Sequence, residues 1–196
     1  MIATRSASAA YGGKRALDLL LVVGLALPAL LISSACALVI WFECRANPFF
    51  IQVRVGRFKQ PFRLIKLRTM IPATADLPSH QVGHSGLLRS GRIFRRLKFD
   101  ELPQILNVLR GEMSFVGPRP CLPTQKELIQ ERLRRGVYEI LPGITGPAQI
   151  AGIDMSTPIA LAAADAAYLN QLTLKKDVEI LMRTIAGAGR GDAILR

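Results

Sequence analysis

Cysteine is scarce in this chain of 196 residues, and its three cysteines, Cys36, Cys44 and Cys121, form no Cys-x-x-Cys pair. An odd number of widely spaced thiols argues against a disulfide scaffold and against a structural zinc site. His80 and His84 are four residues apart, but their surroundings are loop-like and offer no further ligands, so we expect no zinc there. Free thiols fit a reducing, cytoplasm-facing location.

Acidic and aromatic residues are also few. The 14 Asp and Glu residues are outnumbered by 26 Lys and Arg, which gives a net charge of +12 and predicts acidic partners. Nucleic acid, phosphorylated small molecules and an anionic membrane surface all meet that description. Aromatics make up only 6% of the chain, and no stacking platform for nucleic acid is visible. Signatures of a Walker loop, a dinucleotide fold or a serine hydrolase are missing as well.

Charged residues are absent between Leu19 and Phe42. A helix of about 24 residues rises about 1.5 Å per residue and so exceeds the roughly 30 Å of a bilayer's hydrocarbon core. The run is longer than the apolar core of a signal peptide. It therefore predicts a retained membrane anchor.

Two features complicate a simple crossing. Pro28 lies near the middle of the run, where it removes a helix hydrogen bond and bends the axis. Basic residues also flank both ends, with Lys14 and Arg15 before and Arg45 and Arg54 after, and positive flanks normally stay cytoplasmic. A helix that enters, breaks and returns fits both facts, and a proline-kinked single crossing fits the first.

The rest of the chain reads as one mostly helical unit. Residues 49–58 and 62–70 alternate apolar and polar side chains, which predicts a β-hairpin. Loops are expected at 72–91 and 141–152, helices at 92–99, 101–110, 123–136, 157–170 and 174–186, and a fraying tail after Ala186. The fold class expected is therefore α/β, mostly helical, with a membrane helix at 14–44 and a cytoplasmic catalytic domain at 45–196.

The adjacent acids Asp100 and Glu101 are the first candidates for chemistry. Consecutive acids on a surface helix usually mean solvation or a favourable interaction with the helix N-terminus. Neighbouring helical side chains point about 100° apart, so the two carboxylates can also divide two tasks, one attacking phosphorus and the other holding a metal ion. A basic run at 92–98 precedes them, and Arg119 follows between two prolines.

Several basic residues are candidates for phosphate binding. Arg96 belongs to the basic run, and Lys66 and Arg68 share one face of the second hairpin strand because they are two residues apart. The alternative is a solvated sheet face and a basic surface that touches lipid headgroups. Arg119 is the best single candidate, because its flanking prolines stiffen the backbone.

The order of these motifs resembles the bacterial sugar transferase family, the small monotopic enzymes that transfer sugar phosphates to polyprenyl phosphate. The resemblance runs from about Lys14 to Ile185 and is most specific in the long block from DELPQ to GPRP. It is carried by FxQxRVG, FRLIKLRTM, RRLKFDELPQILNVLRGEMSFVGPRP, LPGITGPAQIAG and DAAYLNQLTLKKDVEIL.

The resemblance implies a membrane fold and a reaction. It implies a re-entrant helix that is broken at Pro28 and enters and leaves on the cytoplasmic side, which favours the hairpin over the single crossing. The expected enzyme is a glycosyl-1-phosphate transferase of the bacterial inner membrane. Asp100 would attack the sugar-bearing phosphate of a UDP-sugar, release UMP and form a phosphosugar intermediate, which undecaprenyl phosphate then accepts. Glu101 would coordinate Mg²⁺, and Lys66, Arg119 and Asp165 fall on positions associated with the site.

The chain departs from the family pattern at three places. Family members commonly have a serine just before the helix-breaking proline, where this chain has Leu27. They commonly have Thr-Ser where this chain has Leu97-Lys98, and many carry arginine where it has Ile153, so a phosphate contact is expected to be missing or replaced at Ile153. An isolated acid on an alanine-rich helix, such as Asp165, is ordinarily solvent-exposed.

Two other functions remain as rivals. One is a catalytically inactive membrane-anchored scaffold of a polysaccharide pathway, and the other is a membrane-tethered nucleic-acid binder. The expected partners are a UDP-sugar, polyprenyl (undecaprenyl) phosphate and membrane lipids, with no nucleic acid. The apolar anchor offers a surface for a homodimer. No motif predicts which sugar is transferred or which glycan pathway it feeds.

Overall fold

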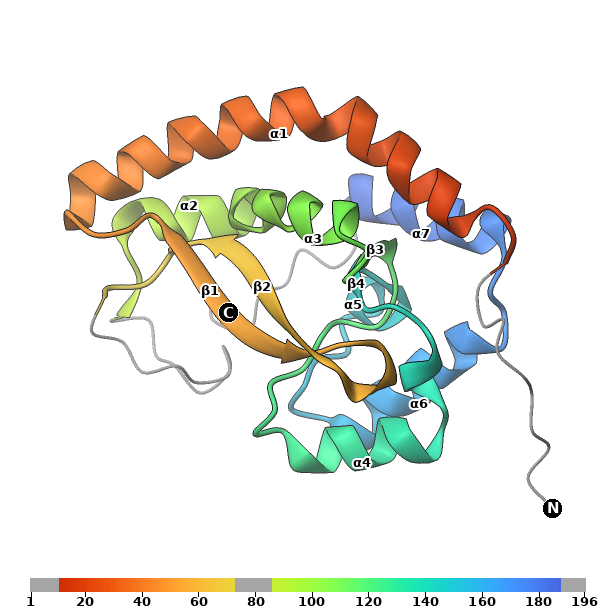
Figure 1. Ribbon diagram of the computed structural model, residues 1–196. Coiled ribbons are helices and arrows are strands. Elements are labelled where there is room, and N and C mark those ends of the chain that lie inside the picture. The colour runs from red at the N-terminus through yellow and green to blue at the C-terminus, as the bar shows by residue number, and fades with distance from the viewer. Residues whose placement is uncertain (1–10, 73–85, 188–196) are drawn as a thin grey trace, which may run out of the picture.

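The computed structural model describes residues 11–72 and 86–187. His80, His84, much of the loop expected at 72–91 and nearly all of the tail after Ala186 lie outside these residues. The described part is mostly helical, as expected from the sequence, and carries one antiparallel hairpin (Figure 1).

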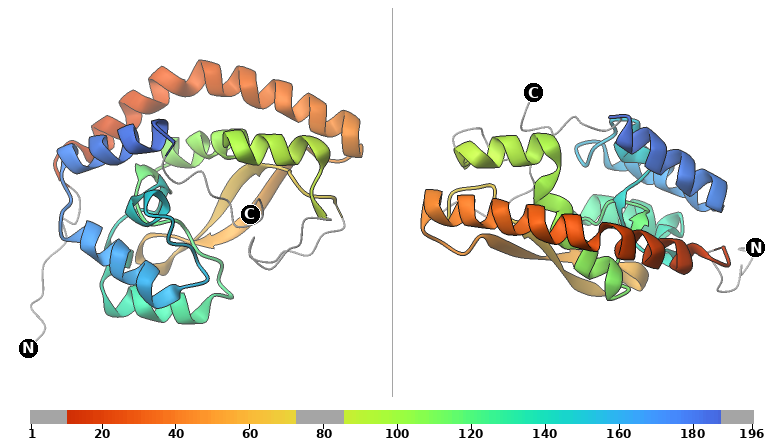
Figure 2. Two further views of the ribbon diagram at one scale, coloured as in Figure 1. Left: turned by 180° about the vertical axis from the view of Figure 1, so that it is seen from behind. Right: turned by 90° about the horizontal axis from the view of Figure 1, so that it is seen from above.

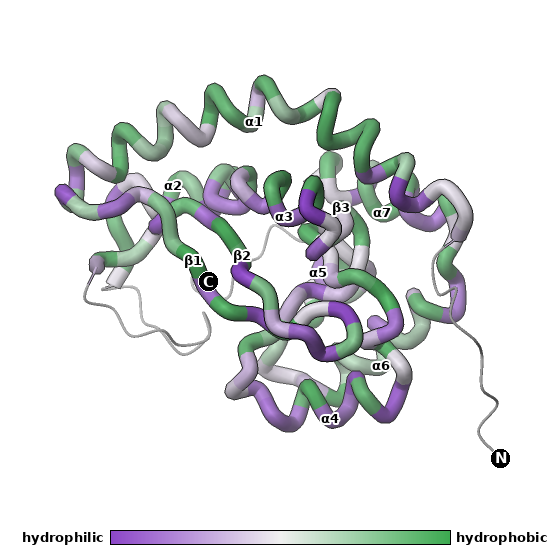
Figure 3. The backbone as a smooth tube through the Cα atoms, viewed as in Figure 1, coloured by the Kyte–Doolittle hydropathy of each residue, from purple (hydrophilic) through white to green (hydrophobic). Residues whose placement is uncertain are grey.

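Helix α1 (Lys14–Cys44) contains the whole uncharged run and is long and apolar enough to cross a membrane. It continues through Pro28 as one helix and arches over the rest of the molecule (Figure 1). Its inner face buries Val22, Ala29 and Ile40, whereas its outer face is exposed and apolar (Figure 3). The two separate helices of a hairpin are therefore not seen in α1, and its course in a membrane stays a prediction.

The predicted hairpin is confirmed. Strands β1 (Phe49–Val55) and β2 (Pro61–Leu67) pair antiparallel from Phe49↔Leu67 to Val55↔Pro61, and a 3-10 turn, η1 (Arg57–Lys59), joins them. Phe62 and Leu64 are buried on one face of β2 because alternate side chains of a strand point to opposite faces. Lys66, two residues after Leu64, lies on that same face, and Leu67 is buried on the opposite one.

The segment that carries the acid pair differs from the two helices expected at 92–99 and 101–110. Helix α2 (Arg89–Leu97) ends at Lys98, which adopts left-handed backbone angles with φ 61°, and the 3-10 helix η4 (Phe99–Gln104) follows. Only then does the short helix α3 (Ile105–Leu109) begin. Pro103 lies inside η4 and has no N–H to donate to a helical carbonyl.

Two short strands were not expected from the sequence. Strand β3 (Ser114–Val116) pairs in parallel with β4 (Gly143–Thr145). Both β4 and helix α5 (Pro147–Ile150), which follows it directly, lie inside the loop expected at 141–152. A Cβ on Gly143 would lie 2.1 Å from the backbone nitrogen of Gly117, so only glycine allows the chain segments to approach this closely. The close approach fixes the start of the loop that carries Arg119.

The remaining helices surround this small sheet. Helices α6 (Pro158–Leu169) and α7 (Leu174–Ile185) confirm the two helices expected near the end of the chain. Helix α4 (Lys126–Arg134) is shorter than the expected 123–136, and the 3-10 turn η5 (Val137–Glu139) follows it. Seen from behind, α4 and α6 lie on the side of the molecule away from α1 (Figure 2).

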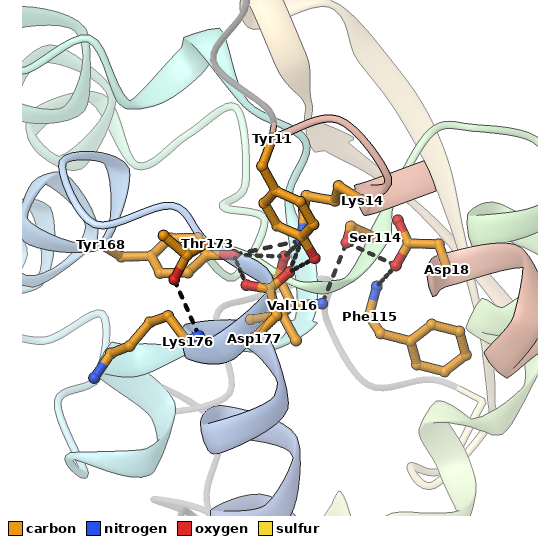
Figure 4. A network of polar contacts seen from close by, with 10 residues as sticks. All are labelled: Tyr11, Lys14, Asp18, Ser114, Phe115, Val116, Tyr168, Thr173, Lys176 and Asp177. Atoms are coloured by element: carbon orange, nitrogen blue, oxygen red, sulfur yellow. Dashed lines mark hydrogen bonds and ion pairs between the residues drawn. The ribbon is translucent and has the colours of Figure 1, made fainter. Parts of the chain in front are cut away.

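A polar network joins the start of α1 to the end of the chain (Figure 4). The Lys14 ammonium donates to Oδ2 of Asp177 at 2.5 Å and to the carbonyl of Val116 at 3.0 Å. Tyr168 donates from its hydroxyl to the other oxygen, Oδ1, of Asp177 at 2.6 Å. Both charged groups are buried, so α1, β3 and α7 are tied together in the interior of the protein.

Candidate active site

Asp100 lies directly after the left-handed turn, at the start of η4, and only 7% of it is exposed. Lys66 on β2 and Arg95 on α2 are close enough for their charges to act on its carboxylate. Its Oδ1 atom is buried and has no hydrogen-bond partner. A buried oxygen without a partner is costly, and such atoms are characteristic of functional sites.

The two neighbouring acids titrate in opposite directions. Burial raises the pKa of Asp100 to about 7, and the adjacent negative charge of Glu101 adds to this, whereas Lys66 and Arg95 oppose it. Burial also acts to raise the pKa of Glu101, but the positive charges of Arg119 and Lys98 outweigh it and lower that pKa to about 2. The pair therefore holds one fixed anion beside one carboxyl group that titrates near neutrality.

Lys66 is perturbed by the same surroundings. Burial, together with the nearby positive charges of Arg54 and Arg95, lowers the pKa of Lys66 to about 8, although the charge of Asp100 acts to raise it. Its ammonium lies 5.0 Å from the centre of the Phe50 ring. The structure thus brings Lys66 to the acid pair, as predicted.

Arg119 reaches the pair from the loop after β3. Its Nη2 lies 2.5 Å from Oε1 of Glu101, with 43% of the arginine side chain and 11% of the glutamate side chain exposed. The neighbouring backbone is held on the hairpin side, because Arg54 donates from Nη1 to the carbonyl of Pro120 at 3.2 Å. One end of the guanidinium is therefore fixed on Glu101 while its exposed part faces solvent.

Asp165 pairs with an arginine outside the acid pair. It is fully buried on α6, which corrects the expectation of an exposed acid, and it pairs with Arg132 on α4 at 2.7 Å. Arg132 in turn donates from Nη1 to the backbone carbonyl of Arg119 at 2.9 Å. Asp165 thus supports the Arg119 loop through Arg132, and among the described residues it forms no hydrogen bond or ion pair with another predicted site residue.

Arg96 and Arg68 are not brought into the cluster. Arg96 is exposed on α2. Arg68 donates from Nε to the carbonyl of Asn47 at 2.7 Å, so it supports the chain entering β1. Among the described residues, no hydrogen bond or ion pair links either arginine to Asp100 or Glu101.

Sequence reasoning missed two buried arginines. Arg95 is 4% exposed and donates from Nε to the Thr69 hydroxyl at 2.8 Å, so its charge stays close to Asp100. Arg132 is 1% exposed. A signal for Arg132 does exist, because it follows the buried Leu128 by four residues and so lies on the same face of α4.

The acid pair has donors suited to a divalent cation. Among residues 11–72 and 86–187, no three His, Cys, Asp or Glu side chains form a metal cluster. Mg²⁺, however, usually takes only one or two carboxylates and completes its shell with water and substrate phosphates. The unpartnered Oδ1 of Asp100 and the ionised Glu101 fit that pattern.

The whole chain can be compared with known proteins. Residues 9–190 match the bacterial sugar transferase family. The chain belongs to this family. The predicted family and the predicted class of enzyme, a transferase, are thereby confirmed.

Two bacterial relatives illustrate the range of lengths among bacterial sugar transferases. A UDP-glucose:undecaprenyl-phosphate glucose-1-phosphate transferase of Caulobacter vibrioides is 38% identical over 184 residues, which cover 88% of this chain and 68% of the relative. An undecaprenyl-phosphate glucose phosphotransferase of Komagataeibacter xylinus is 36% identical over 188 residues, which cover 88% of this chain and only 35% of the relative.

Two of the departures from the family pattern, Lys98 and Ile153, have a visible role in the structure. Lys98 forms the left-handed turn before the acids, and its charge lowers the pKa of both Asp100 and Glu101 against the effect of burial. Ile153 is partly buried against the apolar cluster of Leu128 and Leu161. Its side chain therefore has a packing role.

Proposed function

We propose that this transferase moves a sugar phosphate from a UDP-sugar to undecaprenyl phosphate through a covalent bond to Asp100. The observation that carries the proposal is the buried Asp100 carboxyl group, which has one unpartnered oxygen and two cationic neighbours. The relatives support it, because two of them are named for transfer from or to these classes of substrate.

The reaction needs two displacements at phosphorus. An Asp100 carboxylate oxygen attacks the sugar-bearing phosphorus, the bond to the oxygen of UMP breaks, and an acyl phosphate forms. After UMP leaves, an oxygen of undecaprenyl phosphate attacks the same phosphorus and the Asp100 carboxylate is released. Each step breaks one phosphorus–oxygen bond and forms another, so no redox partner is needed.

The surrounding residues serve charge and position. Lys66 and Arg119 would neutralise the anionic phosphates, and Arg132 with Asp165 would keep the Arg119 loop in place. Mg²⁺, held by Glu101 with the free Asp100 oxygen nearby, would stabilise the charge that develops on the leaving group. The apolar α1 would place this site at the cytoplasmic face of the inner membrane as a re-entrant anchor, close to a lipid acceptor.

The test is UMP release by the full chain in detergent, first with UDP-glucose and Mg²⁺ and then with a panel of UDP-sugars. We expect Asp100→Asn to abolish release, and mass spectrometry to detect the phosphosugar adduct on the wild-type protein only. Glu179→Gln, which changes an exposed acid on α7 that pairs with Lys176, is the matched control. Equal UMP release by Asp100→Asn would refute the nucleophile, and no release from any UDP-sugar would favour the inactive scaffold.

A further inference from the structure

One end of α1 holds the beginning of the segment that carries the acid pair. We call residues 89–109, which comprise α2, η4 and α3, the catalytic segment. Near the C-terminal end of α1, Glu43 accepts from the backbone N–H of Arg89 at 2.7 Å and from that of Ser90 at 3.2 Å. The first N–H groups of a helix lack partners within it, and a carboxylate also favours this positive end of the helix dipole.

The other end of α1 holds the end of the same segment. Arg15 donates from Nη1 to the carbonyl of Val108 at 2.6 Å and from Nη2 to that of Leu109 at 2.9 Å. Carbonyls at a helix C-terminus also lack partners, and a cation favours this negative end. Arg15, which the sequence offered only as a charge flanking the anchor, therefore has a specific partner.

The catalytic segment does not supply these caps itself. Leu88, at the N-cap of α2, makes no side-chain cap bond, and the first turn of α2 contains no acid. The last turn of α3 contains no basic residue. Both missing charges come from α1, at positions roughly 40 Å apart along it, and each has the sign that its helix end favours.

The position of Asp100 depends on this support. The carboxylate has an oxygen without a hydrogen bond, so its place is set chiefly by the backbone, which turns at the left-handed Lys98. Helix α1 packs against η4, the element that carries Asp100. Figures 1 and 2 show α1 arched over α2 and α3.

We propose that Glu43 and Arg15 are positioning residues that hold the catalytic segment at both ends against the membrane helix and thereby set the place of Asp100. The proposal rests on the proposed function of Asp100. In the described part of the chain, neither residue forms a hydrogen bond or ion pair with Asp100 or Glu101, so neither is a catalytic residue. Small displacements of a nucleophile cost rate because attack requires close alignment.

The first test compares kcat and KM for UMP release by Glu43→Gln and Arg15→Gln. We expect kcat to fall about tenfold in each because Asp100 is less well placed, while KM for the UDP-sugar stays within about twofold because substrate contacts are kept. The shorter carboxylate of Glu43→Asp should recover part of the loss. Glu179→Gln on α7 and Arg110→Gln, both exposed substitutions of the same type, are the matched controls. Unchanged kcat in both test variants would overturn the proposal.

A second variant separates positioning from helix stability. Arg89→Glu, added to Glu43→Gln, returns a carboxylate to the first turn of α2 without linking it to α1. We expect this double variant to recover thermal stability but not kcat, with Arg89→Glu alone as its reference. Full recovery of kcat would show that Glu43 serves only the stability of α2 and would refute positioning.

Hydrogen–deuterium exchange tests the support independently of turnover. In Glu43→Gln we expect the amides of Arg89 and Ser90 to exchange at least about tenfold faster, because their acceptor is weakened. If the wild-type chain released no UMP, the proposed function would fail, but this measurement would still test the link to α1. Exchange equal to that of the wild type throughout 89–109 would overturn it.

Discussion

Two of the buried polar regions in the described part of the chain differ in how completely their groups are paired. Around Asp177, both carboxylate oxygens accept hydrogen bonds, from Tyr168 on one side and from Lys14 and Tyr11 on the other (Figure 4). Around Asp100, one carboxylate oxygen has no hydrogen bond although cations surround it. The first region is satisfied by the fold itself, whereas the second is left for a ligand to satisfy.

The comparison predicts opposite effects of one substitution in the two regions. Asp177→Asn should have the largest effect, because it leaves the buried Lys14 ammonium without its counter-charge. We expect it to lower the free energy of unfolding by about 3–5 kcal/mol. Chemical denaturation in detergent, with Glu179→Gln on the same helix as control, measures the loss. A change below about 1 kcal/mol, the range of exposed ion pairs, would contradict the view of this network as structural.

Asp100→Asn should instead stabilise the protein, and increasingly so as pH rises. Asp100 has its pKa raised from 3.8 to about 7, so folding favours the protonated form. Stability from this group is complete below about pH 4 and is lost as pH rises through 7, by at most about 4 kcal/mol. We expect the Tm of the variant to exceed that of the wild type more at pH 8 than at pH 4. A Tm difference that does not depend on pH would refute the raised pKa.

Activity should follow the same titration in the other direction. The proposed attack requires the Asp100 carboxylate, so the rate of UMP release should rise as pH approaches 7, and it should fall again above about 8, where Lys66 loses the charge proposed to neutralise phosphate. Arg119→Lys would sharpen this result, because it leaves Asp100 in place while changing the cation beside Glu101. A rate that is flat between pH 5 and 8 would argue that another group limits the first displacement.

Asp165→Asn tests the support behind the site. The change removes the counter-charge of the buried Arg132, which holds the backbone of Arg119. We expect a loss of about 3 kcal/mol in stability together with a reduced kcat that persists at temperatures where the variant is folded. Full kcat in the folded variant would confine Asp165 to a stabilising role.

Arg96→Gln should have the smallest effect. Arg96 is exposed on α2 and, in the described part of the chain, forms no hydrogen bond or ion pair with the acid pair. Stability should change by less than about 0.5 kcal/mol, and kcat in detergent should match that of the wild type. A large fall in kcat would return Arg96 to the substrate site that the sequence assigned it.

Elements that depend on residues close together in the sequence were predicted correctly. The hairpin, α6 and α7 follow from alternation or helical periodicity within single stretches, and the acid pair is visible as two consecutive acidic residues. Strands β3 and β4 escaped because each has three residues and nearly all are buried, so neither shows alternation. Their pairing joins residues almost 30 positions apart, which no window of sequence reports.

The charged residues that gather around Asp100 were among the predicted candidates, but the buried arginines that support them were not singled out. Asp100, Glu101, Lys66 and Arg119 do gather as expected. Arg132 and Arg95 were indistinguishable by sequence from the many solvated arginines of a basic chain, because only packing decides which of them are buried. The role of Asp165 was misjudged for the same reason, since its partner lies on a different helix.

The buried pair between Lys14 and Asp177 also bears on how the protein is made. The two residues are 163 positions apart, so at about 5–20 residues per second the ribosome adds Asp177 on the order of 10–30 s after Lys14. During that interval α1 can reach the membrane, but Lys14 in its first turn has no counter-charge. The link that Lys14 forms between α7 and β3 is also missing. The enzyme therefore completes its interior only when α7 arrives, and a chain released before that helix should be a substrate for proteases.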